Sequence, residues 1–186
     1  MTITLHRANQ YPKQRWSQGS TQQLLIHPPS SHFSAGDYQL RLSIATVEAQ
    51  RSHFTALHGV HRRLMVLSGH QALVHEGRHS ADLAPFEQDA FCAHWETHCR
   101  GCAVNFNLMT KGECESALEA VHLAPAQRLD IVQDAELGFR YLAKGAVKWG
   151  VEHLVAGDGV ALQAGDRVTL ESLEHSTLIV ANYSSR

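Results

Sequence analysis

Short runs of alternating apolar and polar residues, separated by glycine turns, recur through most of the chain after residue 36. Residues 38–47 (YQLRLSIATV) alternate in this way, and residues 62–69 (RRLMVLSG) end at a turn glycine before the run 71–77 (QALVHEG). A period of two places every second side chain on one face, as in a half-buried β-strand. Many short strands with a turn signal about every 8–12 residues predict an all-β sandwich or barrel. Residues 111–124 contain helix-favouring alanine, leucine and glutamate but also alternate, and we favour a strand there.

Two segments repeat the same order of strand, glycine turn and returning strand. They are residues 63–74 (RLMVLSGHQALV) and residues 139–150 (FRYLAKGAVKWG). A duplicated unit of this length predicts two related β-rich halves in one chain. We place these halves at residues 1–110 and 111–186, and we allow strands to be exchanged between them.

Composition and charge exclude several classes of protein. The chain has 16 lysines and arginines against 18 acidic residues, and neither sign forms a block. A nucleic-acid-binding protein would instead carry a basic stripe. No apolar run approaches the roughly 18 residues that span a bilayer, and the N-terminus lacks the apolar core of a signal peptide. We therefore expect a cytoplasmic protein with free thiols and with neither nucleic acid nor membrane as a partner.

Histidine is abundant, with 14 residues, but its spacing argues against a bound metal. The facial site of iron and manganese enzymes needs two histidines two positions apart, and no such pair occurs. Residues 75–79 (HEGRH) match the H-E-x-x-H pattern of zinc proteases, which requires both histidines on one face of a helix. Gly77 and the flanking turns instead predict a hairpin tip at which His75 and His79 are surface residues. The sequence thus predicts neither a metal nor another cofactor.

Two asparagines stand inside a predicted strand in residues 102–113 (CAVNFNLMTKGE). Alternation places Asn105 and Asn107 on one face, and Phe106 and Leu108 on the other. Asparagine is a poor strand residue because its amide competes for backbone hydrogen bonds. Amides can nevertheless face a cavity at lower cost than charges, if water or a ligand satisfies them. We predict that both asparagines border an interior pocket.

Residues 38–69, together with residues 105–111, resemble the HutD/Ves family. That family's pattern runs approximately aromatic-x-W-R-x-S-I-A, F-S-x-F-P-G-x-x-R, L-x-G and D-F-N-x-M-T-R. The corresponding blocks here read YQLRLSIA, FTALHGVHR, LSG and NFNLMTK, with the spacing between them preserved. The resemblance implies a bicupin fold, in which two cupin-like antiparallel β-barrels or sandwiches share one chain without the usual cupin metal ligands. It also implies a link to histidine utilisation or to cold and stress response, with no established reaction.

The chain departs from the family pattern at several positions. The early block W-K-N-G-G-G-x-T-R-E is represented by residues 16–23 (WSQGSTQQ), which lack its asparagine, arginine and glutamate. Leu40 replaces a tryptophan, Leu57-His58-Gly59 replaces F-P-G, and Asn105 replaces the aspartate of D-F-N. Since an aspartate would repel an anion that Asn105 tolerates, we expect a more acidic ligand than the family pattern suggests.

Polar residues at the matching positions form the predicted binding set. An arginine that lines a barrel is costly unless it meets a carboxylate, and its planar fork suits a bidentate carboxylate. The predicted ligand-binding residues are Arg41, Ser43, Arg62, Asn105, Asn107 and Trp16. The alternative is an exposed polar face with both arginines in water, or an internal salt bridge such as arginine with Glu48.

Three functional classes remain open from the sequence. The leading hypothesis is a non-catalytic binding or sensing protein for a small anionic metabolite. The alternative is a cupin enzyme, an isomerase or hydrolase that acts on a small organic acid. A third is a structural or interaction protein whose pocket has decayed. Assembly into a homodimer is a further open expectation.

Overall fold

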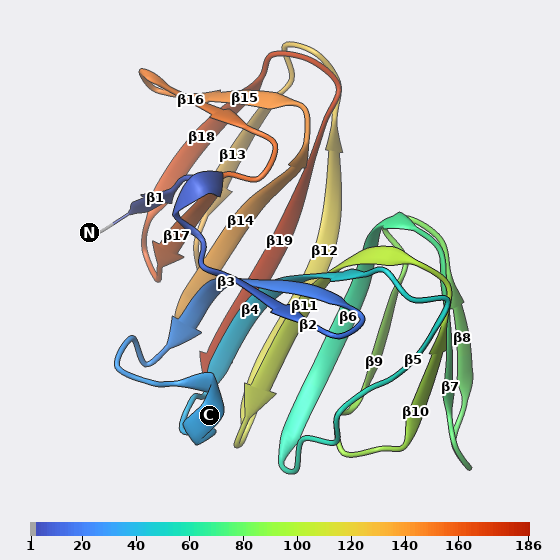
Figure 1. The fold of residues 1–186 in the computed structure, drawn as a ribbon. Coiled ribbons are helices and arrows are strands. Elements are labelled where there is room, and N and C mark those ends of the chain that lie inside the picture. The colour runs from blue at the N-terminus through green and yellow to red at the C-terminus, as the bar shows by residue number, and fades with distance from the viewer. Residues whose placement is uncertain (1–2) are drawn as a thin grey trace. The chain divides into compact units, whose positions relative to one another are not determined.

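The computed structural model describes residues 3–186, and its regular structure in that range is almost entirely β-strand (Figure 1). Two single-turn 3-10 helices, η1 (Ala8–Gln10) and η2 (Phe33–Ala35), are the exceptions. The prediction of an all-β fold is therefore confirmed. Within residues 3–186, no helix has the length and apolar character needed to cross a membrane.

The chain divides into two compact units. One contains residues 12–112, and the other contains residues 113–186 together with the N-terminal segment up to Tyr11. The halves expected from the sequence, 1–110 and 111–186, differ from these units at residues 111–112 and, more importantly, in the assignment of that N-terminal segment. The reason is that β1 (Thr4–His6) pairs with β17 (Gly159–Gln163), a strand of the second unit.

The unit of residues 12–112 is built from two antiparallel sheets. The larger sheet contains, in spatial order, β2 (Lys13–Trp16), β3 (Gly19–His27), β4 (Leu40–Val47), β11 (Ala103–Lys111), β6 (Val60–Gly69) and β9 (Gln88–Cys92). The smaller sheet contains β5 (Arg51–His53), β10 (Thr97–Arg100), β7 (Gln71–His75) and β8 (Ser80–Leu83).

The other unit also has a larger and a smaller sheet. In spatial order, the larger contains β1, β17, β14 (Leu137–Lys144), β19 (Ser176–Ser185) and β12 (Cys114–Leu123). The smaller contains β13 (Arg128–Val132), β18 (Arg167–Ser172), β15 (Ala146–Trp149) and β16 (Glu152–Val155). Strand β12 resolves the ambiguity over residues 111–124 in favour of a strand.

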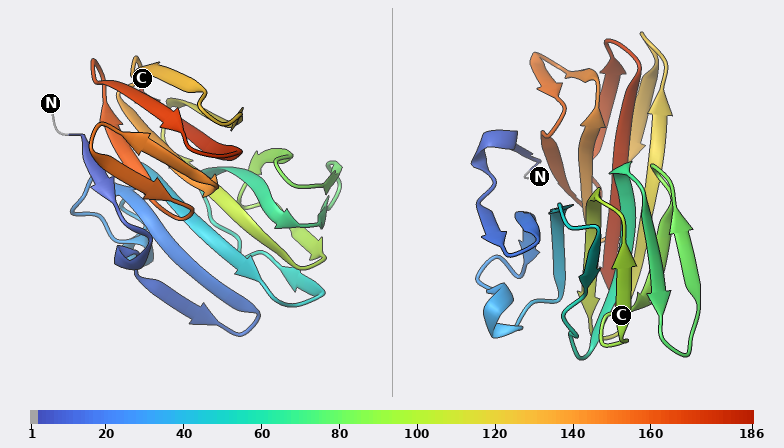
Figure 2. Two further views of the ribbon diagram at one scale, coloured as in Figure 1. Left: turned by 90° about the horizontal axis from the view of Figure 1, so that it is seen from above. Right: turned by 45° about the vertical axis from the view of Figure 1, so that its right-hand side comes forward.

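The strand orders of the two units correspond. The series β4-β11-β6-β9 has the same arrangement as β12-β19-β14-β17, and β5-β10-β7-β8 the same as β13-β18-β15-β16. Figure 2 shows the strands of each unit in two further views. In the described residues each sheet is open, with two edge strands, so of the two expected architectures, barrels or sandwiches, closed barrels are not formed. Two-layered open sheets replace them.

Glycines at equivalent junctions explain the repeat that the sequence displays. Gly69 is the last residue of β6, just before β7, and Gly145 lies between β14 and β15, where the chain leaves the larger sheet for the smaller one. Their φ angles are +82° and +87°, in the region that favours glycine. A β-carbon would also collide with the Cys102 carbonyl oxygen at the first site and with the Ser176 hydroxyl at the second. Both junctions therefore require glycine.

Apolar residues from both sheets form the core of each unit. In residues 12–112 the cluster comprises Leu64, Val66, Leu73, Leu83, Phe91, Cys99 and Ala103. In the other unit it comprises Leu123, Ile131, Leu142, Val147, Leu154, Val160, Leu162, Val168, Leu170 and Leu178. Burying one such large apolar side chain is worth about 1.5–3 kcal/mol, so these clusters hold the open sheets face to face.

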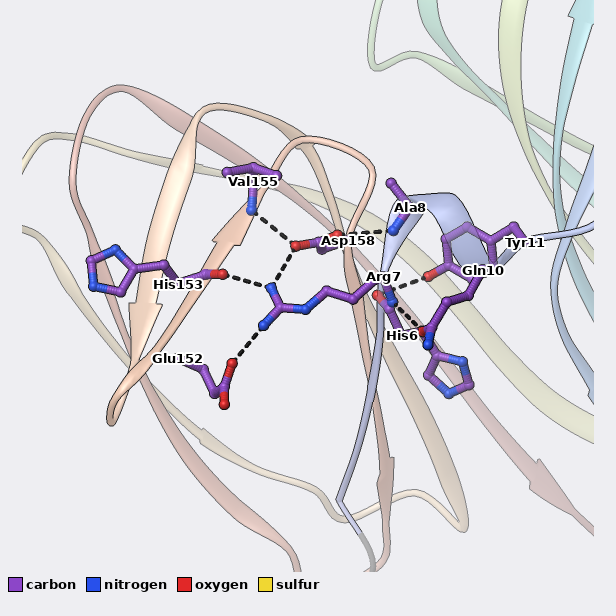
Figure 3. Close-up of polar contacts among 9 residues, drawn as sticks. All are labelled: His6, Arg7, Ala8, Gln10, Tyr11, Glu152, His153, Val155 and Asp158. Atoms are coloured by element: carbon purple, nitrogen blue, oxygen red, sulfur yellow. Dashed lines mark hydrogen bonds and ion pairs between the residues drawn. The ribbon is translucent and has the colours of Figure 1, made fainter.

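A buried carboxylate anchors the N-terminal segment (Figure 3). Arg7 Nη1 donates to Asp158 Oδ2 at 3.0 Å, and the Ala8 amide donates to Asp158 Oδ1 at 2.9 Å. The Val155 amide donates to the same carboxylate at 3.2 Å. Arg7 also pairs with the half-exposed Glu152 at 2.5 Å. Asp158 is 2% exposed, so its carboxylate depends on these donors for compensation.

Candidate functional site

A cavity of about 480 Å³ lies within the unit of residues 12–112. Strands β2, β3, β4, β6 and β11 contribute to its walls, together with residues 53–57. Its volume is in the range of sites that hold small molecules, roughly 300–1,000 Å³. All six residues selected from the sequence line this one cavity: Trp16, Arg41, Ser43, Arg62, Asn105 and Asn107.

Strand register brings these side chains together. Met109 of β11 lies opposite Arg41 of β4 on one side and opposite Arg62 of β6 on the other. Two residues along β11, Asn107 lies opposite Ser43. Side chains that lie directly opposite on antiparallel strands project from the same face of the sheet. The neighbouring strands β4, β11 and β6 therefore direct their polar side chains into the same cavity.

Arg62 is fixed on aromatic rings and on one asparagine. Its Nε and Nη2 donate to Asn107 Oδ1 at 2.9 and 2.6 Å. Its guanidinium lies 4.3 Å from the centre of the Phe54 ring and 5.7 Å from that of Phe91. Burial, with a smaller contribution from the charge of Arg41, lowers the pKa of Arg62 to about 10. Arg62 therefore carries its charge at neutral pH.

Arg41 is held in a similar way. Its Nε donates to Gln23 Oε1 at 3.1 Å, and its Nη1 donates to Ser43 Oγ at 3.3 Å. The guanidinium lies 4.0 Å from the centre of the Phe33 ring. Burial lowers the pKa of Arg41, which is only 7% exposed. The expected alternative of an arginine in bulk water is therefore excluded for Arg41.

Neither arginine has a carboxylate partner among the described residues. Glu48, which the sequence offered as an internal partner, instead pairs with the exposed Arg15 at 3.1 Å. Two guanidinium groups thus share a cavity, and no anionic side chain of residues 3–186 balances them. Since a buried, unbalanced charge is costly, each guanidinium depends on its amide, hydroxyl and ring contacts for compensation.

Asn105, a lining residue of the cavity, has one buried polar atom without a hydrogen-bond partner. Its Nδ2 donates to Gln71 Oε1 at 2.7 Å, while its Oδ1 is buried without a partner. If the side-chain amides of Asn105 and Gln71 are both turned by a half rotation, so that their nitrogen and oxygen atoms exchange places, the Asn105 nitrogen is left unpaired instead. An unsatisfied buried group of this kind costs about 1–3 kcal/mol of stability.

Trp16 lies at the rim of the cavity. It is 39% exposed, and its Nε1 donates to Thr21 Oγ1 at 3.2 Å. Sequence reasoning missed the rings of Phe33 and Phe54, which support the two arginines. Both residues lie outside the β-strands, so the alternation of apolar and polar residues could not indicate which way their side chains point.

The prediction that His75 is a surface residue is wrong. His75 is 1% exposed, and its Nε2 lies 2.8 Å from Asp89 Oδ2. His79 is exposed, as expected, but its Nε2 lies 3.0 Å from Asp89 Oδ1. The rings of Phe91 and Trp95 cover His75, with centroids 4.4 and 5.7 Å away. The hairpin tip is thus packed against β9.

Comparisons with known proteins agree with this fold. A model of the HutD family matches residues 8–184. A conserved protein of unknown function from Pseudomonas aeruginosa PAO1 is similar over 100% of both chains, with 24% identity and a TM-score of 0.83. HutD from Pseudomonas fluorescens SBW25 is similar over 100% of both chains, with 21% identity and a TM-score of 0.76.

A more distant cupin-like neighbour is the bacterial pirin YhhW from Escherichia coli, solved in complex with nickel(II). It has 11% identity and a TM-score of 0.75 over 100% of both chains. A search of the curated proteins by sequence found no match. At these identities, the structural likeness establishes a cupin-like all-β fold.

Proposed function

The chain belongs to the HutD family, and on that premise we propose that it is a non-catalytic, cytoplasmic protein that binds or senses a small anionic metabolite. The binding site is the cavity of residues 12–112. The observation that carries the proposal is the pair of arginines, Arg41 and Arg62, that share this cavity without a carboxylate partner among the described residues. We further propose that the two units are the two cupin-like halves of a bicupin.

The cavity wall suits a small carboxylic acid. The guanidinium forks of Arg41 and Arg62 can each hold a carboxylate through parallel hydrogen bonds. Ser43 and Asn107 add a hydroxyl and an amide beside them. The family pattern has an aspartate where this chain has Asn105, so the wall here carries one negative charge fewer. This difference favours an acid with more than one carboxylate, and the acids of histidine breakdown are suitable first candidates.

The lining offers little for acid–base catalysis. Among the described lining residues there is no aspartate, glutamate, lysine or cysteine, and His53 is the only histidine. An isomerase or hydrolase would need a positioned proton donor and acceptor near the reacting atoms. This composition supports the binding role over the enzymatic alternative.

A thermal-shift screen of small mono- and dicarboxylic acids, including histidine-pathway acids, tests the proposal. A ligand that binds only the native state stabilises it by RT ln(1 + [L]/Kd), about 2.7 kcal/mol at a hundredfold excess over Kd. We expect stabilisation by an acid but not by its neutral amide, and no product in the same sample by NMR. Turnover of the acid would favour the enzyme, and a flat screen would favour a pocket that has lost its ligand.

Binding of the acid is expected to be independent of pH between about pH 7.5 and about pH 9. Burial lowers the pKa of Arg62 only to about 10, so the cation persists across this interval. The pKa of Arg62 in the folded protein lies below its value in the unfolded chain, because burial disfavours the charged form. This unfavourable contribution to folding stability is present throughout the interval and is relieved only as the pH rises through about 10. Isothermal titration at several pH values checks this. If the affinity for the acid already falls steeply at a pH lower than about 9, a group other than Arg62 controls binding.

A further inference from the structure

Three side chains with metal-ligating atoms meet outside the arginine cavity. One nitrogen of His75, one nitrogen of His79 and one carboxylate oxygen of Asp89 all lie within 4.8 Å of one another. His75 is buried, Asp89 is partly buried and His79 is exposed, so the cluster reaches from the interior to solvent. Two imidazoles and one carboxylate form a ligand set found in zinc sites.

A hairpin, rather than a helix, places the two histidines on one face. The His75 amide donates to the His79 carbonyl at 2.9 Å, and the Arg78 amide donates to the His75 carbonyl at 2.9 Å. His75 and His79 are therefore opposite each other at the end of the β7–β8 ladder, one step beyond Val74 and Ser80. Opposed residues share a face, and their ring centroids are 4.6 Å apart. A separation of four residues places two side chains on one face of a helix. It also places them on one face of a hairpin whose loop has three residues.

Hydrogen bonding fixes which nitrogen of His75 can accept a cation. The Thr97 hydroxyl donates its single proton to the Trp95 carbonyl at 3.1 Å. Its oxygen therefore accepts from His75 Nδ1 at 2.8 Å, which places a proton on Nδ1. His75 Nε2 lies 2.8 Å from Asp89 Oδ2, so the second ring nitrogen and the carboxylate face each other. A cation between them takes the place of the proton that this contact otherwise shares, and Thr97 supplies the outer-shell partner typical of metal-bound histidine.

The cluster also lies at the open seam of the unit. Strand β8 is the last strand of the smaller sheet and β9 the last of the larger sheet (Figure 1). The two edge strands are neighbours, yet no ladder among the described residues pairs them. His75 and His79 belong to the hairpin of the smaller sheet, while Asp89 belongs to β9. A metal ion held by all three would join the two sheets where backbone pairing does not.

We propose that His75, His79 and Asp89 form a zinc site that closes the seam between β8 and β9. Zinc takes nitrogen and oxygen ligands tetrahedrally at about 2.0–2.2 Å, which places neighbouring ligand atoms about 3.3 Å apart. The observed nitrogen–oxygen separations of 2.8–3.1 Å need to widen only slightly to admit the ion. Nε2 of each histidine and one Asp89 oxygen are the protein ligands. Water occupies the fourth position, on the exposed side of His79.

Zinc binding to the purified full chain tests the site. When the chelator-treated protein is supplied with zinc and then dialysed, we expect one tightly bound zinc per chain by elemental analysis, and a higher thermal midpoint than that of the zinc-free protein. The variant His79→Ala removes an exposed ligand and should abolish both effects while far-UV circular dichroism stays unchanged. Thr97→Val should weaken binding roughly 10–100-fold, as loss of an outer-shell partner does. Asp89→Asn provides a second ligand variant.

The same hairpin supplies a matched control for unspecific binding by a histidine-rich chain. His70 and Asp82 form an exposed pair at 2.9 Å with no third ligand in the described residues. His70→Ala should leave the zinc stoichiometry, affinity and thermal shift unchanged. The proposal is overturned if the wild type holds no stoichiometric zinc, if His79→Ala binds zinc as tightly as the wild type, or if His70→Ala loses it equally.

Discussion

Replacing Arg62 with alanine is expected to abolish the stabilisation that the best acid of the screen gives to the wild-type protein. At a hundredfold excess over Kd this stabilisation is about 2.7 kcal/mol in the wild type and should approach zero in the variant. The reason is that Arg62 supplies one of the two guanidinium groups in the cavity, and its loss removes half of the positive charge that faces the acid. Chemical denaturation with and without the acid measures the difference.

Two control variants separate binding from folding in this experiment. Arg62→Lys keeps the charge but loses the planar fork, so an intermediate stabilisation is expected. Arg100→Ala removes an exposed arginine from the same unit and should leave the ligand effect intact. If Arg62→Ala folds and retains the full stabilisation, Arg62 does not belong to the site.

Replacing Asp158 with alanine is expected to cost about 3 kcal/mol and to release the N-terminal segment. The change removes the acceptor of the Ala8 and Val155 amides and one partner of Arg7. Each buried donor left unpaired costs about 1–3 kcal/mol. Hydrogen exchange should accelerate over β1 while β14 and β19 stay protected.

The neighbouring ion pair provides the contrast. Glu152 contacts the same arginine but is 46% exposed, and Glu152→Ala should cost at most about 1 kcal/mol, as surface pairs do. Denaturation of the two variants side by side measures the difference. Equal losses of stability would mean that the buried carboxylate has no special role in anchoring residues 3–11.

The local part of the fold could be predicted because strand alternation and glycine turns are properties of a few adjacent residues. Alternation in residues 38–47 and 102–113 correctly identified β4 and β11. The positions of Gly69 and Gly145 identified the repeated junction. The pattern left barrels and sandwiches both possible, since closure depends on whether the edge strands of the two sheets, such as β8 and β9, pair with each other, and alternation within one strand does not specify its partner. The N-terminal segment was assigned to the first half for the same reason, because its partner β17 lies far along the chain.

The sequence by itself determined which side chains share a face. Asn105 and Asn107 had to point the same way because a strand has a period of two, and so did Arg41 and Ser43. Only the tertiary structure decided which strands are neighbours, and so which charges meet. It brought Arg41 and Arg62 into one cavity without a carboxylate among the described residues, and it placed the rings of Phe33 and Phe54 against them. It also buried His75 beside Asp89, because packing between two sheets follows from non-local contacts that no local pattern specifies.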